Sequence, residues 1–188
     1  MKRFFDFICS LLAIILLSPV LLLLSMVILI DSGRPIVFRQ KRVGLNNQLF
    51  DIRKFRTMKQ GTRNAPTADL KEFDHCVTRC GRFLRKTSLD ELPQLFNILI
   101  GDMSLVGPRP ERPQYVEKFK EEIPRYMIKH QVRPGLTGWA QINGYRGDTS
   151  IRKRIEYDIY YIENWSMSFD FKIMFLTIFR GFINENAY

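Results

Sequence analysis

The sequence has few residues for covalent cross-links or for histidine chemistry. It contains three cysteines and two histidines among 188 residues. An odd cysteine count with no spaced framework argues against a disulfide scaffold and favours a reducing compartment. Cys76 and Cys80 follow His75, but this spacing makes a poor zinc site. His75 and His130 belong to no recognisable motif, which argues against Ser/His/Asp or Cys/His nucleophilic catalysis.

Several other signatures are missing. The chain has no Walker-type glycine loop, no internal repeat and no low-complexity tract. RNP, KH and helix-turn-helix patterns are absent too, so nucleic acid is a weak candidate despite the basic composition. What the chain does have is a net charge of +10 and a pI near 9.7. These values point to an anionic partner, either a lipid surface or a phosphorylated substrate.

A long apolar run extends from Phe4 to Ile30, interrupted only by Asp6 and by small or hydroxyl residues. It is longer than the apolar core of a signal peptide and has no evident cleavage site, so we expect it to be retained. It is also long enough to cross a bilayer, which takes about 20 residues.

The apolar run has two features that are unusual for a plain spanning helix. Ser18-Pro19 lies at its middle, and a proline there removes a backbone donor and kinks the helix. Both flanks are also basic, and cytoplasmic flanks are rich in Lys and Arg. Two topologies therefore stay open, a re-entrant helix that bends at Pro19 and a single-pass anchor that tolerates the proline.

Residues 31–63 form a basic block, with nine Lys or Arg residues against two aspartates. Within it, residues 36–38 and 49–55 are typical of short strands joined by a turn at 44–47. Such a block is attracted to anionic headgroups, which alone could explain it. Lys54 and Arg56 are two positions apart, so on one strand both side chains would lie on the same face and could point at a single site.

An acid pair, Asp90-Glu91, lies at a predicted helix start within residues 88–100. Ser88 and Glu91 fit a capping box, in which both acids serve only the helix end. The same geometry also suits phosphate chemistry, because a helix start binds phosphate and Mg²⁺ favours carboxylates together with substrate phosphates. One acid could then attack phosphorus while its neighbour holds the metal.

Cations flank the acid pair. Arg85 precedes it, and Arg109 follows between two prolines that stiffen the local backbone, which suits a bidentate phosphate contact. The remaining predictions are a loop at 60–76, a short helix or turn at 77–84, helical periodicity at 113–130 with a break at Pro124, loop–strand–loop at 133–144, a charged helix at 151–164, and an apolar segment at 169–183 that is either an interfacial helix or a core helix.

The ordered motifs closely resemble those of the bacterial sugar transferase family, the small monotopic phosphoglycosyl transferases. The resemblance covers almost the whole chain. The residues that carry it are Ser18-Pro19, Lys54 to Met58, Leu89 to Gln94, Gly101 to Ser104, Gly107 to Pro110, Arg133 to Gly138, and Tyr157-Asp158 near Asn164 to Ser166.

The resemblance implies transfer of a sugar 1-phosphate from a UDP-sugar to polyprenyl (undecaprenyl) phosphate, with release of UMP. It implies that Asp90 forms a covalent phospho-sugar ester and that Glu91 binds Mg²⁺. The helix would be re-entrant at Ser18-Pro19. The catalytic domain would lie on the cytoplasmic face of the bacterial inner membrane. The residues expected to bind substrate or phosphate are Lys54, Arg56, Arg85, Arg109, Arg133, Gln141 and Asn143.

Residues 138–147 resemble the hexose-1-phosphate branch, which serves capsule and exopolysaccharide assembly and favours glucose or galactose. A short stretch between Thr149 and Glu156 departs from that branch and leaves the sugar open. Larger members carry additional spanning helices, so we expect this chain to be the minimal catalytic unit. The oligomeric state is also open, with a homodimer as one alternative.

The fold prediction is a mixed α/β chain (α+β, mostly helical) in a monotopic membrane protein. It comprises a re-entrant membrane helix at 1–32 and a cytoplasmic-facing catalytic domain at 33–188, with a small hairpin and interfacial amphipathic helices. The rival prediction is a membrane-tethered basic module that binds anionic lipid or nucleic acid without catalysis.

Overall fold

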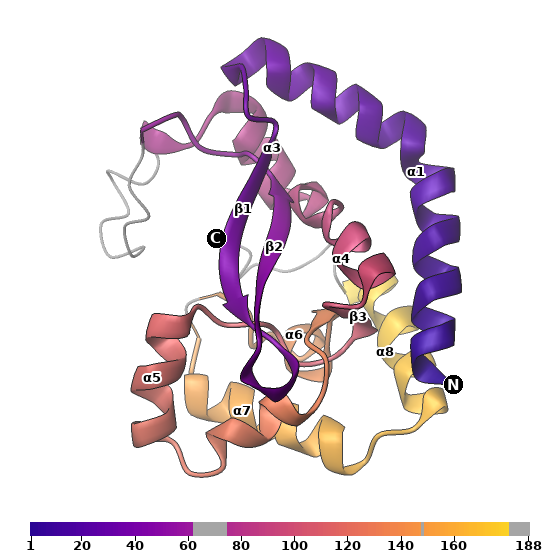
Figure 1. Ribbon diagram of the computed structural model, residues 1–188, viewed down its shortest axis with the longest axis vertical. Helices are drawn as coiled ribbons and strands as arrows, with labels where there is room; N and C mark the ends of the chain where they lie inside the picture. Colours follow the sequence, from indigo (N-terminus) through magenta and orange to yellow (C-terminus); the bar gives the residue numbers. More distant parts are fainter. Residues whose placement is uncertain (62–74, 148, 181–188) are drawn as a thin grey trace.

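The computed structural model describes residues 1–61, 75–147 and 149–180, and within them helices dominate over two small two-stranded sheets (Figure 1). This confirms the prediction of a mostly helical chain with little sheet. In chain order the elements are α1 (Lys2–Ser32), β1 (Val37–Val43), η1 (Leu45–Asn47), β2 (Leu49–Phe55), α3 (Arg79–Lys86), η2 (Leu89–Glu91), α4 (Gln94–Ile100), β3 (Ser104–Val106), α5 (Pro113–Glu122), η3 (Tyr126–Gln131), β4 (Gly135–Thr137), α6 (Trp139–Ile142), α7 (Ile151–Glu163) and α8 (Met167–Arg180).

Helix α1 contains the whole apolar run and bends near its middle, so its two halves point in different directions (Figure 1). Pro19 lies inside the helix and has no N–H to donate to the carbonyl of Ile15. The hydroxyl of Ser18 donates to that carbonyl at 2.8 Å instead. The Ser-Pro pair therefore bends the helix without leaving this carbonyl unpaired. By length and composition α1 is able to cross a membrane.

Both ends of α1 are attached to the same globular part of the chain. Near the first end, Arg3 donates to the carbonyl of Leu99 at 2.7 Å, and Asp6 accepts from the backbone N–H of Leu105 at 3.0 Å. At the other end, the guanidinium of Arg56 donates to the carbonyl of Gly33 at 2.6 Å. Because the helix is bent, both of its ends contact the same domain.

Strands β1 and β2 form an antiparallel hairpin in which Val37 lies opposite Phe55 and Val43 opposite Leu49. The bounds predicted for β2 are confirmed, whereas β1 is longer than the predicted 36–38. One face of the hairpin covers α4, and α4 in turn packs against α1. The apolar residues of this layer are Phe50, Ile52, Leu95, Ile98 and Met103, with Ala13, Ile14 and Leu17 of α1 beside them.

The parallel pair β3–β4 holds two glycine-containing segments in direct backbone contact. A Cβ at Gly135 would lie 2.1 Å from the backbone N of Gly107, and one at Gly138 would lie 2.3 Å from the carbonyl oxygen of Gly107. Only glycine allows such an approach without movement of the backbone. The segment predicted as loop–strand–loop at 133–144 contains β4, but it continues as the short helix α6, so that prediction was wrong in its second half.

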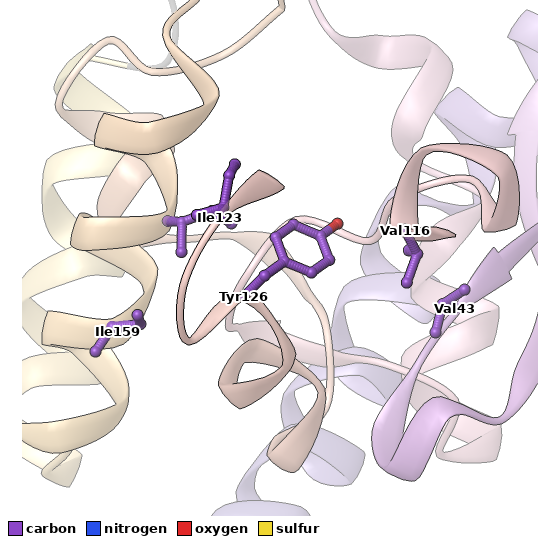
Figure 2. Close-up of a cluster of buried hydrophobic side chains, with 6 residues drawn as sticks. Val43, Val116, Ile123, Tyr126 and Ile159 are labelled. Atoms are coloured by element: carbon purple, nitrogen blue, oxygen red, sulfur yellow. The ribbon is translucent and has the colours of Figure 1, made fainter. Parts of the chain in front are cut away.

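A separate apolar cluster joins the far end of the hairpin to α5, η3 and α7. Figure 2 shows the ring of Tyr126 between Ile123 and Ile159 on one side and Val116 and Val43 on the other. The predicted break at Pro124 is confirmed, because α5 ends at Glu122 and η3 begins at Tyr126. The predicted helix at 151–164 is α7, and its apolar face is buried in this cluster.

Helix α8 is attached to the first end of α1 through a buried acid. Asp170 is ion-paired with Lys2 and accepts from the Tyr161 hydroxyl at 2.7 Å and from the Trp165 indole at 3.1 Å. The other face of α8 exposes Phe171, Phe175, Ile178 and Phe179. The segment predicted at 169–183 is therefore helical through Arg180, and its last residues lie outside the described part.

Candidate functional site

The acid pair lies in a tight turn that differs from the predicted capped helix. Ser88 has φ 57° and ψ 15°, the left-handed region, whereas an N-cap residue needs an extended backbone. Its side chain does not cap the turn but accepts from a guanidinium nitrogen of Arg146 at 3.0 Å. The capping-box prediction was therefore wrong. A 3₁₀ turn, η2, presents the two acids, and the regular helix α4 begins only at Gln94.

The carboxylate of Glu91 is buried and in contact with three cations. Its Oε1 atom lies 2.7 Å from Nζ of Lys54, 2.8 Å from Nη2 of Arg109 and 3.3 Å from Nη2 of Arg146. Each cation comes from a different element: Lys54 from β2, Arg109 from the proline-flanked loop after β3, and Arg146 from the turn after α6. We call this group of four residues the Glu91 cluster.

Electrostatics keeps Glu91 ionised. Burial on its own raises the pKa of the carboxyl, but Arg109, Lys54 and Arg146 oppose it and hold the pKa well below its usual value. Burial also lowers the pKa of the Lys54 ammonium, an effect that Glu91 partly offsets. One carboxylate thus holds three cationic side chains close together.

The neighbouring acid behaves differently. Burial raises the pKa of the Asp90 carboxyl, Lys54 lowers it in part, and the negative charge of Glu91 raises it again. Two adjacent acids with pKa values pushed apart by their surroundings can take different chemical roles. Because a more basic carboxylate is a stronger nucleophile, Asp90 is the better candidate for attack and Glu91 for holding charge.

Arg85 is a further cation near Asp90. It lies in the last turn of α3 and donates through Nε to the hydroxyl of the buried Thr57 at 2.8 Å. Its charge lowers the pKa of Asp90, so the two groups are within electrostatic reach of each other. Of the residues predicted from the sequence, the structure therefore brings together Lys54, Arg85 and Arg109 with the acid pair.

Four other predicted residues make their hydrogen bonds outside the Glu91 cluster. Arg56 binds the C-terminal end of α1 through Ser32 and Gly33, as described above. The remaining three bond to backbone carbonyls: Arg133 to Gly101 at 2.9 Å, Gln141 to Leu136 at 3.2 Å, and Asn143 to Trp139 at 2.7 Å. Arg133 also lines a separate cavity of about 290 Å³ together with Lys2 and Arg3.

Arg146 is the member of the cluster that sequence reasoning missed. It donates to Ser88 at 3.0 Å and lies 3.3 Å from Glu91. The one available signal was its position between Gly144 and Gly147, where a turn presents a cation much as the prolines present Arg109. That signal indicates that a turn exposes the Arg146 side chain, but it does not predict that the side chain contacts Glu91.

The donor set fits a magnesium ion only in part. The acid pair offers two adjacent carboxylates, and among the described residues no group of three or more His, Cys, Asp or Glu side chains could hold a metal. Mg²⁺ is commonly bound by one or two carboxylates, with water and substrate phosphates as its other ligands. The residues present therefore fit Mg²⁺ that arrives with a phosphorylated substrate.

A turn that carries two acids beside three cations is chemically suited to binding phosphate groups. The sequence profile of the bacterial sugar transferase family matches residues 1–184, and the chain belongs to this family.

Curated relatives support the same placement. The chain is 45% identical over its whole length to a UDP-glucose:undecaprenyl-phosphate glucose-1-phosphate transferase of Escherichia coli (strain K12) and 47% identical to the Klebsiella pneumoniae protein of the same name. Over 94% of its length it is 46% identical to a UDP-N-acetylgalactosamine-undecaprenyl-phosphate N-acetylgalactosaminephosphotransferase of Aeromonas hydrophila. The chain spans about two fifths of the length of these relatives, 41%, 41% and 42% respectively.

Glu91→Gln should increase the affinity for inorganic pyrophosphate, measured by calorimetry without divalent ions. The substitution removes the carboxylate that competes with an added anion for the three cations, so we expect about a tenfold gain. Asp51→Asn is the control, because Asp51 pairs with the exposed Lys41 outside the cluster. Equal affinities in Glu91→Gln and the unaltered protein would contradict an anion site at these cations.

Proposed function

We propose that this chain transfers a sugar 1-phosphate from a UDP-sugar to undecaprenyl phosphate and releases UMP. Such a reaction begins the assembly of a lipid-linked glycan for capsule or exopolysaccharide. The observation that carries the proposal is the acid pair beside three convergent cations. The surroundings keep Glu91 ionised and make the carboxylate of Asp90 more basic. Two relatives are named for transfer of glucose 1-phosphate from UDP-glucose to undecaprenyl phosphate, which supports the proposal.

Asp90 is the proposed nucleophile. A carboxylate oxygen of Asp90 forms a bond to the phosphorus next to the sugar, and the bond from that phosphorus to the bridging oxygen breaks, so UMP leaves with the electron pair. The phosphate oxygen of the lipid acceptor then attacks the same phosphorus. This second step frees the Asp90 carboxylate and yields the lipid diphosphosugar, so atoms and charge balance over the two steps.

The cations act on the transferring group. Lys54, Arg109 and Arg146 are arranged to neutralise the negative charge that gathers on the phosphoryl oxygens. Arg85 partly offsets the rise that burial causes in the pKa of Asp90. Because their groups are fixed before substrate arrives, little reorganisation is needed at the moment of reaction. Mg²⁺ bound with the diphosphate would add further charge neutralisation, and Glu91 is the residue proposed to hold it.

The sugar is the least constrained part of the proposal. Two of the relatives named above are glucose-1-phosphate transferases, whereas the Aeromonas relative is named for N-acetylgalactosamine. UDP-glucose is therefore the first donor to test, followed by UDP-galactose and UDP-N-acetylgalactosamine.

We further propose that α1 is re-entrant and that the protein lies on the cytoplasmic face of the bacterial inner membrane. The bend at Pro19 and the attachment of both helix ends to one domain support this topology. The exposed face of α1 is apolar along both halves, and α8 exposes a further apolar strip near the first end. Basic residues flank the apolar run on both sides, Lys2 and Arg3 before it and Arg34 after it, as is typical of cytoplasmic flanks.

Asp90→Asn should abolish UMP release from UDP-glucose in the presence of undecaprenyl phosphate, with a loss of at least about 1,000-fold, since the amide cannot act as the nucleophile. Coupled detection of UMP measures the rate. Asp51→Asn, a matched change of an exposed aspartate, should keep the rate of the unaltered protein. Turnover retained in Asp90→Asn would remove Asp90 as the nucleophile.

Magnesium should increase the affinity for UDP in the unaltered protein and have little effect in Glu91→Gln. Glu91 supplies a ligand that the amide replaces poorly, because Mg²⁺ prefers charged carboxylate oxygen. Titration of UDP with and without EDTA measures both affinities. A magnesium effect of equal size in the two proteins would show that Glu91 is not a ligand.

Cysteines at positions 2 and 34 should be labelled from the same side of the membrane, the cytoplasmic side. Single-cysteine proteins, with the three natural cysteines replaced by serine, are treated with a membrane-impermeant maleimide in intact cells and in inside-out vesicles. Lys118→Cys, exposed on α5, reports the side on which the domain lies. Labelling of positions 2 and 34 from opposite sides would rule out the re-entrant helix.

A further inference from the structure

The two arginines of the Glu91 cluster are carried by separate loops that share one buried contact. Arg109 lies in the loop after β3, and Arg146 lies in the turn after α6. Neither loop is a regular element, so hydrogen bonds within helices or strands do not fix the position of either arginine. A contact that joins the two loops would set the spacing of the two guanidinium groups.

Arg154 of α7 makes that contact. Its Nη1 atom donates to Oε1 of Glu111, two residues after Arg109, at 2.9 Å. Its Nη2 atom donates to the backbone carbonyl of Gly147, the residue after Arg146, at 2.6 Å, and to the Thr149 hydroxyl at 3.3 Å. One planar guanidinium therefore binds both loops, and α7 anchors it to the apolar cluster of Figure 2.

The contact is a buried ion pair between Arg154 and Glu111. The side chains of Arg154 and Glu111 are 9% and 11% exposed. Burial alone raises the pKa of the Glu111 carboxyl, but the charges of Lys129, Arg154 and Arg42 have a larger, opposite effect. The pKa of Glu111 therefore lies below its usual value, and the carboxyl is ionised. The backbone carbonyl of Glu111 also accepts from the N–H of Val43 at 3.0 Å. The loop of Arg109 is thus held from the hairpin on one side and from α7 on the other.

We propose that Arg154 and Glu111 are positioning residues that set the spacing of Arg109 and Arg146 around the transferring phosphate. Neither residue is expected to touch substrate. Their effect passes through the two loops, since a displacement of about 1 Å at a catalytic group can cost about 100-fold in rate. The expected effect on kcat rests on the proposed function, whereas the expected effect on anion binding can be tested without turnover.

The first experiment replaces Arg154 by methionine and by lysine and measures kcat and KM for UDP-glucose. Arg154→Met removes the bridge, and kcat should fall about 100-fold with a smaller change in KM. Arg154→Lys keeps the charge but lacks the planar fork that reaches both loops, so kcat should fall about tenfold. The double variant Glu111→Gln/Arg154→Met removes the bridge without leaving a buried charge unpaired, and it should match Arg154→Met in kcat.

Asp158→Asn provides the matched control. Asp158 lies one turn further along α7, is also buried, and pairs with Lys129 at 3.5 Å, so its ion pair connects α7 to η3 and not to either arginine loop. It should keep kcat within about threefold when rates are compared at equal folded fraction. If Asp158→Asn and the Arg154 variants lose activity in parallel with folded fraction, the positioning role is excluded.

The second experiment measures pyrophosphate binding in the Glu91→Gln background. Adding Arg154→Met should weaken binding about tenfold, and adding Asp158→Asn should not change it. Unchanged affinity in both would overturn the inference. Absence of UMP release from the unaltered protein with every UDP-sugar tested would instead count against the proposed function, and the binding comparison would still decide whether Arg154 positions the two arginines.

Discussion

The buried carboxylate of Glu91 is the interaction on which the rest of the site depends. Three cations from a strand, a stiff loop and a glycine-flanked turn converge on one oxygen atom. Removing charges from water costs several kcal/mol for each ion, and only close opposite charges offset that cost. Without an anion at this point the three cations would repel one another, and in the protein without substrate Glu91 supplies that anion.

The backbone around the site is closely packed and locally strained. Gly107, Gly135 and Gly138 place backbone against backbone next to the loop that carries Arg109. Ser88 adopts a left-handed conformation, which costs about 1–3 kcal/mol for a residue with a side chain, and its hydroxyl receives Arg146 there. Local strain is thus located beside the acid pair, where neighbouring contacts hold the backbone in place.

Sequence reasoning identified what depends on local chemistry. The acid pair, the proline-flanked Arg109 and the second strand of the hairpin could be predicted because short-range patterns determine them. It misplaced Arg56, because strand alternation ends with β2 at Phe55 and the next side chain turns toward Ser32. It missed Arg146 and assigned Ser88 to a helix cap for one shared reason: these residues meet across 58 positions, and no local pattern encodes that contact.

The bent helix also has a geometric consequence. Its two ends are fixed to the domain by separate polar contacts, Arg3 and Asp6 at one end and Arg56 at the other. Lys54 of the Glu91 cluster lies two positions before Arg56, so the same short segment connects the end of the helix to the site. On the proposed topology, the depth of the bend in the bilayer sets the height of Asp90 above the lipid phosphates. The apolar helix would then both anchor the domain and fix the height of the nucleophile at the level of the lipid-borne phosphate.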